Sequence, residues 1–113
     1  MAERTDVVRV ETTVDDREGA ERVAGSIVEN RLAACAQVSG PIRSFYRWEG
    51  AVQSDEEWMV VIKTSADRLD DLVAHVVDVH PYDVPEIVAV PVIGGNPSYL
   101  AWVEDETRGG GAE

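Results

Sequence analysis

The sequence predicts an α+β fold of the ferredoxin-like kind, a single four-stranded antiparallel sheet in βαββαβ order with both helices on one face and with the first and third strands central. Two stretches with helical apolar periodicity alternate with stretches rich in β-branched residues, and a glycine turn separates the second strand from the third. A chain of 113 residues that is 44% hydrophobic has room for one modest core. We therefore expect one domain over residues 1–113, with an ordered core of about 6–107 and mobile ends.

The first strand is expected over residues 6–14, where β-branched side chains dominate and no turn former occurs. Asp15 and Glu18 then form a predicted capping pair ahead of a helix. The apolar stripe of this helix has members three and four positions apart, namely Ala20, Val23, Ala24, Ile27, Val28 and Leu32.

The second strand is expected to leave this helix over residues 32–38, to break or bend at Gly40–Pro41, and to resume over 42–49. Gly50 and Ala51 suit a two-residue hairpin loop with glycine in the first central position. The third strand is expected over residues 52–64. The two strands together predict a long hairpin.

The second helix is expected over about residues 67–79, with one apolar face made by Leu69, Leu72, Val73, Val76 and Val77. Pro81 ends it, because proline disfavours the α conformation in the residue before it. A fourth strand over 86–93 contains Pro91, which cannot donate to a ladder and so predicts a sheet edge. Asn96 and Pro97 predict a short helix to Val103, and residues 108–113 are expected to be mobile.

The third strand is apolar on both of its faces, and this predicts self-association. Trp58, Val60 and Ile62 alternate with Met59 and Val61. The two helices cover one face of the sheet, whereas a solvated second face should carry polar side chains. An apolar sheet face without a cover is an association surface, and closed symmetry is the usual result.

The charge balance argues against several classes of partner. The chain has 22 Asp and Glu against 10 Lys and Arg, a net charge of −12, so counterion release from phosphates cannot drive nucleic-acid binding. The same field repels anionic membranes, and no apolar run approaches the roughly 20 residues of a membrane span. The N-terminal residues lack the pattern of a signal peptide, and a single cysteine fits a reducing compartment. We expect a cytoplasmic protein.

His80 is the strongest candidate metal ligand on chemistry alone, because neutral imidazole binds copper and zinc and a helix end leaves the ring accessible. The alternative is that His80 only complements the C-terminal end of the second helix. Cys35 is interpreted as a buried core thiol, and both His75 and the acidic pair Glu56-Glu57 are interpreted as solvated.

A second set of candidates could line a cleft between subunits. Lys63 could clamp an anion there or pair with a carboxylate such as Glu86. Aromatic side chains of the hairpin and of the last helix are typical interface anchors, namely Tyr46, Trp48, Tyr99 and Trp102. No catalytic constellation or metal-binding motif occurs in the sequence, so we do not expect an enzyme.

Four local signatures together resemble the CutA family, from the first strand to about Thr107. They are Leu32-Ala-Ala-Cys35, Tyr46-Arg-Trp-Glu-Gly50, His80-Pro-Tyr-Asp-Val-Pro-Glu-Ile87 and Gly95-Asn-Pro-Ser-Tyr-Leu-Ala-Trp102. The resemblance implies a ferredoxin-like protomer, a homotrimer packed sheet to sheet, weak binding of copper(II) or another divalent cation, and a link to metal tolerance. It also implies an architectural likeness to trimeric PII signalling proteins, and hence an alternative role as a regulatory trimer that binds a small effector in its clefts.

The resemblance also implies two metal-ligand positions in this chain. Relatives that bind copper carry a cysteine where this chain has Glu11, and a histidine doublet where it has Val79 and His80. His80 matches the family pattern, and Glu11 can offer a carboxylate oxygen but not a soft thiolate. His80 and Glu11 are therefore the expected metal site.

Overall fold

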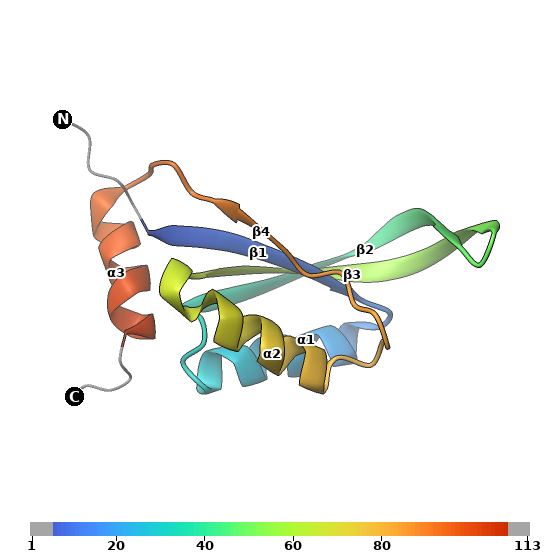
Figure 1. Cartoon of the computed structure of the whole chain (residues 1–113), viewed down its shortest axis with the longest axis horizontal. Helices are drawn as coiled ribbons and strands as arrows, with labels where there is room; N and C mark the ends of the chain where they lie inside the picture. Colours follow the sequence, from blue (N-terminus) through green and yellow to red (C-terminus); the bar gives the residue numbers. More distant parts are fainter. Residues whose placement is uncertain (1–5, 109–113) are drawn as a thin grey trace.

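The computed structural model describes residues 6–108 and has an α+β fold with one four-stranded antiparallel sheet (Figure 1). Its elements in chain order are β1 Val7–Val14, α1 Arg17–Glu29, β2 Cys35–Trp48, β3 Ala51–Ser65, a short 3-10 helix Ala66–Arg68, α2 Leu69–Val79, β4 Val88–Pro91 and α3 Pro97–Thr107. The strand order is β2-β3-β1-β4, so β1 and β3 are central, as predicted. Pro91 ends β4 at a sheet edge, where a missing N–H costs no ladder bond.

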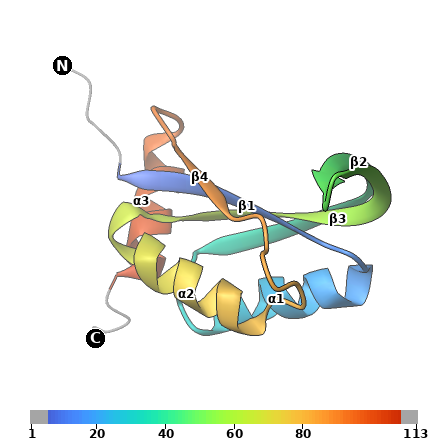
Figure 2. The same cartoon turned by 45° about the vertical axis from the view of Figure 1, so that its right-hand side comes forward.

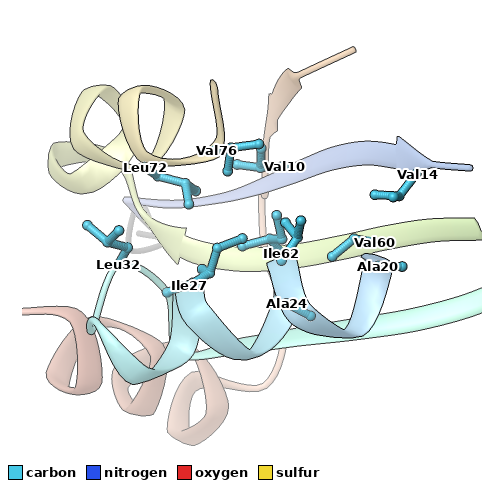
Figure 3. Packing of buried hydrophobic residues seen from close by; sticks show 12 residues of the cluster. Val10, Val14, Ala20, Ala24, Ile27, Leu32, Val60, Ile62, Leu72 and Val76 are labelled. Atoms are coloured by element: carbon cyan, nitrogen blue, oxygen red, sulfur yellow. The ribbon is translucent and has the colours of Figure 1, made fainter. Parts of the chain in front are cut away.

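The main core lies between the sheet and the two helices α1 and α2, which cover the same face (Figure 2). Val10 and Ile62 point from the sheet toward Ile27 of α1 and Leu72 of α2, and all four are fully buried (Figure 3). Burial of each such side chain contributes about 1.5–3 kcal/mol relative to its exposed state. The predicted apolar stripes supply this core, except that Val28 and Val77 at their margins are exposed.

The C-terminal helix α3 lies at one end of the sheet, apart from α1 and α2 (Figure 1). Val103 packs there with Val7 and Ala34 in a small second cluster, joined by Val92 and Leu100. Asn96 caps the helix by accepting a hydrogen bond from the Ser98 N–H at 3.1 Å, as the Asn-Pro pair predicts. The helix runs on to Thr107 rather than ending at Val103, because its buried residues Val103 and Thr107 lie one turn apart.

Helix α1 differs from its prediction at both ends. Its N-cap is Asp16, whose carboxylate accepts from the Gly19 N–H at 2.9 Å, so the cap lies one residue beyond the predicted Asp15. The helix ends at Glu29, because Arg31 adopts a left-handed backbone with a φ of 57°. Leu32 is buried but belongs to the loop between α1 and β2.

Three strand boundaries also differ from their predictions. Strand β2 runs from Cys35 to Trp48 rather than starting at residue 32, and of the two predicted alternatives it bends instead of breaking at Gly40–Pro41, in a bulge between Ser39 and Ile42. The hairpin loop is Glu49–Gly50, both with positive φ, so glycine takes the second central position. Strand β4 is limited to Val88–Pro91 within the predicted 86–93. The predicted mobility of 109–113 lies outside the described residues.

The two faces of β3 are as the sequence predicts. Trp58, Val60 and Ile62 pack into the helix-side core. Met59 and Val61 point to the opposite face and are half-buried, with no helix of the described chain over the middle of the sheet on that side. This surface, on the side of Met59 and Val61, is called the open face below.

Candidate functional site

A groove of ≈ 850 Å³ lies at the base of the β2–β3 hairpin. The hairpin extends beyond the end of β1, which stops opposite Trp58, and the segment from His80 to Ile87 passes beside it (Figure 1). Four aromatic side chains line the groove, namely Phe45, Tyr46, Trp48 and Tyr82. Six carboxylates share it, namely Asp15, Asp55, Glu56, Glu57, Asp83 and Glu86.

Glu57 is the most enclosed of these carboxylates, with 8% of its surface exposed. Its two oxygens each accept one hydrogen bond, from the Tyr82 hydroxyl at 2.6 Å and from the Ser44 hydroxyl at 2.7 Å. A buried carboxylate without a cation costs several kcal/mol unless it is hydrogen-bonded, and these two donors supply that compensation. Glu57 thereby joins β3 to β2 and to the segment after α2.

Three ionisable groups around the groove favour their neutral forms, namely Tyr46, Tyr82 and Glu86. Burial, together with the weaker effect of the hydrogen bond to Glu57, raises the pKa of Tyr82 above its ordinary value. The hydrogen bond that the Tyr46 hydroxyl donates to Asp55 is the main cause that raises the pKa of Tyr46. Partial desolvation, and to a smaller extent the charges of Glu11 and Glu57, raises the pKa of Glu86. The groove is therefore an electronegative environment that disfavours further negative charge.

His80 is buried, contrary to the expectation that a helix end leaves its ring accessible. Only 7% of its surface is exposed, and both ring nitrogens have partners. Nε2 lies 2.8 Å from the Thr13 carbonyl oxygen, and Nδ1 accepts a hydrogen bond from the Tyr82 N–H at 3.1 Å. The ring also meets the Tyr82 ring edge-on, with centroids 4.7 Å apart.

Glu11 lies on the open face of β1 and is bonded to Arg9 at 2.9 Å through the arginine Nε. A divalent cation would have to compete with that ion pair for the carboxylate. Within residues 6–108, no group of three or more His, Cys, Asp or Glu side chains is arranged to hold a metal ion. With both nitrogens of His80 occupied as well, the residues of one chain do not fit the metal site that the family resemblance implies.

The remaining cleft candidates gather at the opposite end of the sheet, near α3. Tyr99 and Trp102 stack there with ring centroids 5.6 Å apart, and the Tyr99 hydroxyl shares a hydrogen bond of 3.4 Å with the Cys35 sulfur. Cys35 is half-buried on the open face rather than in the helix-side core, which corrects the sequence interpretation. Lys63 sits opposite Cys35 and donates to Gln37 at 3.1 Å, so its predicted pairing with Glu86 is not seen.

Within one chain, the six predicted cleft residues thus form two groups. Tyr46, Trp48 and Glu86 line the groove, whereas Lys63, Tyr99 and Trp102 belong to the α3 end. Lys63 is six positions along β3 from Glu57, a separation of about 20 Å at the usual strand rise. The two groups can share one cleft only if they come from different copies of the chain.

The sequence interpretation misses some residues of the site. It places Glu57 in a solvated acidic pair, yet Glu57 is buried and bonded to Tyr82. The sequence signal that could have indicated burial of Glu57 is its position directly before the apolar run Trp58–Ile62 of the predicted third strand. His75 is not simply solvated, because its Nε2 bonds the Ser26 hydroxyl at 2.9 Å and links α2 to α1.

The fold and the groove define a class: a small α+β protein with a ferredoxin-like sheet, an open sheet face with Met59 and Val61 at its middle, and an acidic, aromatic groove beside a long hairpin. Residues 8–106 match the family described as CutA1 divalent ion tolerance protein. The chloroplastic protein CutA 1 of Oryza sativa is 48% identical over 99 residues, which are 88% of this chain and 56% of that protein. The divalent-cation tolerance protein CutA of Thermus thermophilus is 42% identical over 95 residues, 84% of this chain and 92% of that protein.

The solved structure of CutA1 from Oryza sativa superposes with a TM-score of 0.90 at 44% identity, covering 94% of this chain and 97% of that one. The chain therefore belongs to the CutA1 divalent ion tolerance family, as its signatures predicted. It spans about half the length of the plant relatives that it matches. Among its described helices, none is long and apolar enough to cross a membrane.

Proposed function

We propose that this protein serves divalent-cation tolerance in the cytoplasm, without catalysis, as a homotrimer that binds copper(II) or another divalent cation weakly. The observation that carries the proposal is the family match over residues 8–106, which includes the groove and the open face. A net charge of −12 attracts cations to the whole surface and favours weak binding. The free thiol of Cys35 is compatible with a reducing compartment.

Of the two proposed ligand positions, Glu11 supports metal binding better than His80. Glu11 is partly exposed and needs only to leave Arg9, whereas His80 would have to give up two hydrogen bonds and its burial. Carboxylate oxygens suit hard divalent cations and select copper poorly. The chemistry of the chain thus supports weak and unselective binding.

Competition separates such a site from the general attraction of an acidic surface. Copper(II) is titrated into the protein in excess magnesium, and Glu11→Gln is compared with Glu49→Gln, which removes one charge at the hairpin tip. A site at Glu11 predicts weaker copper binding in the first variant only. Equal affinities in both variants and in the unmodified chain would remove Glu11 from the site, and no binding above magnesium would remove metal binding from the proposal.

The proposed trimer is supported by the open face and by the division of the cleft residues. Met59 and Val61 are apolar and half-buried, no helix among residues 6–108 covers them, and Val88 and Val90 extend the surface on β4. Contact between the groove end of one copy and the α3 end of another would bring Trp48 and Glu86 near Lys63. Such an interface is expected to bury about 2,000 Å² or more, typical of obligate assembly.

A regulatory trimer that binds a small effector is the second candidate, by analogy with PII proteins. The groove supports it, because ≈ 850 Å³ lined by aromatic and polar side chains is the size of a small-molecule site. A thermal-shift screen of nucleotides and small organic acids and bases is the test. A ligand at 100 times its dissociation constant stabilises by about 2.7 kcal/mol, and shifts no larger than those of simple metal salts would count against this role.

A further inference from the structure

The His80 ring is held in one protonation state by its two partners. A peptide N–H can only donate, so the Tyr82 N–H requires a lone pair on Nδ1. A carbonyl oxygen can only accept, so the Thr13 oxygen requires a hydrogen on Nε2. The geometry therefore assigns the neutral ring with its proton on Nε2, and it leaves neither nitrogen with a free lone pair for a metal.

The Thr13 carbonyl oxygen points toward the β4 side of β1, but β4 provides no backbone N–H to bond it. The Val7 carbonyl accepts from the Val92 N–H, and carbonyls of residues an even number of positions apart point to the same side of a strand. Thr13 thus faces the β4 side, but the pairing of β4 with β1 stops at Val88 opposite Glu11. His80 supplies the donor that a longer β4 would have provided.

The same ring positions Tyr82, two residues further along the chain. The Tyr82 N–H ends on Nδ1, its ring rests edge-on against the imidazole, and its hydroxyl reaches Glu57 on β3. His80 therefore connects the end of β1, through its bond to Thr13, to the groove residue Tyr82. Loss of the ring would release Tyr82, and with it one of the two donors that hold the buried carboxylate of Glu57.

We infer that His80 is a positioning residue rather than a metal ligand: it pins the segment from His80 to Glu86 onto the end of β1 and so holds Tyr82 on Glu57. The inference goes beyond the proposed function and holds whether or not the protein binds a metal.

The protonation state and metal response of the ring can be measured directly. The chain has two histidines, so ¹⁵N NMR of the side chains yields two imidazole patterns, with His75 as an internal reference. We expect His80 in the Nε2–H form at neutral pH, and its signals unchanged when Zn²⁺, a diamagnetic probe, is added to saturation of any site. A proton on Nδ1, or His80 signals that move with Zn²⁺ while the fold is unchanged, would overturn the inference.

Variants separate the two hydrogen bonds. His80→Asn can keep an acceptor for the Tyr82 N–H, His80→Gln can keep a donor for the Thr13 carbonyl, and His80→Ala keeps neither. We expect the amide of Tyr82 to exchange faster in His80→Ala and to regain protection in His80→Asn, with His75→Gln as the matched control that leaves it unchanged. Equal protection of the Tyr82 amide in all variants would contradict the positioning role of His80.

Copper affinity in excess magnesium completes the test on those variants that fold. Loss of even an indirect metal contact typically weakens binding by about tenfold or more. We expect the copper affinities of His80→Asn and His80→Gln to lie within tenfold of that of the unmodified protein. A loss of tenfold or more in both, with Tyr82 still protected, would make His80 a ligand and overturn the inference. Failure of the unmodified protein to bind copper would contradict the proposed function alone.

Discussion

His80 and Tyr82 are joined twice, by a 3.1 Å hydrogen bond from the Tyr82 N–H to Nδ1 and by edge-on contact of their rings at 4.7 Å. Only Pro81 lies between them, and its fixed φ restricts the turn that brings the second residue back onto the first. The spacing His-Pro-Tyr therefore places both contacts within three consecutive residues. This gives a structural reason for one of the signatures on which the family resemblance depends.

Removal of the Tyr82 hydroxyl should test how much the buried carboxylate depends on it. Tyr82→Phe leaves Glu57 with the Ser44 hydroxyl as its remaining described donor. A buried acceptor that loses a partner costs about 1–3 kcal/mol, so we expect a loss of stability in this range. Urea denaturation at fixed protein concentration measures it.

Tyr46→Phe is the matched control for Tyr82→Phe. It also removes a tyrosine hydroxyl that donates to a carboxylate, but Tyr46 and Asp55 lie at the exposed side of the groove. Exposed partners can turn to water, so we expect the smaller effect there. Equal losses in the two variants would show that burial of Glu57 is not what gives the Tyr82 contact its importance.

The sequence predicted the architecture well because the fold depends on periodicity. The alternation of Trp58, Val60 and Ile62 with Met59 and Val61 determines which side chains lie on each face of β3. The predicted ends of individual helices and strands were wrong where a single local contact determines the end. Asp16 caps α1 because its side chain reaches Gly19, and Asp15 offers the same chemistry one residue earlier. Composition does not distinguish the two.

The site was predicted less well because it is made by contacts between distant segments. His80 has the chemistry of a ligand in the sequence, and only the fold shows that Thr13, 67 positions away, occupies its Nε2. Glu57 and Ser44 meet across the hairpin in the same way, 13 positions apart. Residue type indicates what a side chain can bind, whereas tertiary structure decides what it does bind.

Glu86 should destabilise the protein at neutral pH. Its pKa is raised in the folded state, so the folded protein holds that proton more tightly than the unfolded chain, and stability falls as pH rises through the folded-state pKa. Glu86→Gln should therefore be more stable than the unmodified protein at pH 7, by less than about 1 kcal/mol because the side chain is largely exposed.

The advantage of Glu86→Gln should shrink as the pH falls below the ordinary carboxylate pKa of 4.5, where both states of the unmodified protein are protonated. Urea midpoints at pH 7 and pH 4 measure the difference. Glu49→Gln, at the hairpin tip, controls for the general relief of net negative charge. An equal gain in both variants would assign the effect to net charge and not to the groove.

Cys35 should control the ionisation of Tyr99. Their hydrogen bond, with desolvation as the second cause, raises the pKa of Tyr99 to about 12. Cys35→Ala should lower this pKa toward the ordinary value of 10.0. Ultraviolet absorbance titration measures it as the difference from the same variant that also carries Tyr99→Phe. Because the folded-state pKa is raised, the linked stability is present below pH 10 and is lost as pH rises toward 12. An unchanged titration would leave desolvation as the cause.

Gly40 should not tolerate a side chain. A Cβ there would lie 2.8 Å from Cδ1 of Trp58 and 3.1 Å from the Glu57 carbonyl oxygen, and its φ of 153° is one that other residues rarely adopt. We expect Gly40→Ala to cost about 1–3 kcal/mol by urea denaturation. Gly25→Ala is the control, because a Cβ at that position of α1 meets no atom within 4 Å. Alanine should be neutral or stabilising there, since it is the better helix former.

Met59 is the residue of the open face with which assembly can be tested. It points away from α1 and α2, whereas its neighbour Trp58 packs into the helix-side core, so Trp58 cannot report on the open face. If a second copy covers the open face, Met59→Asp buries an unpaired carboxylate, which costs more than about 3 kcal/mol. We expect assembly and folding to be lost together, because an obligate oligomer has no stable folded monomer.

Light scattering of the purified protein at low micromolar concentration measures this assembly directly, and circular dichroism reports the fold in the same samples. Val77→Asp is the matched control, since Val77 is 52% exposed on the outer side of α2 and its substitution should leave the mass unchanged. A folded monomer of 12.4 kDa for the unmodified chain would contradict the proposed trimer. A Met59→Asp variant that keeps the mass of a trimeric unmodified protein would instead show that the open face around Met59 is not the surface that assembles.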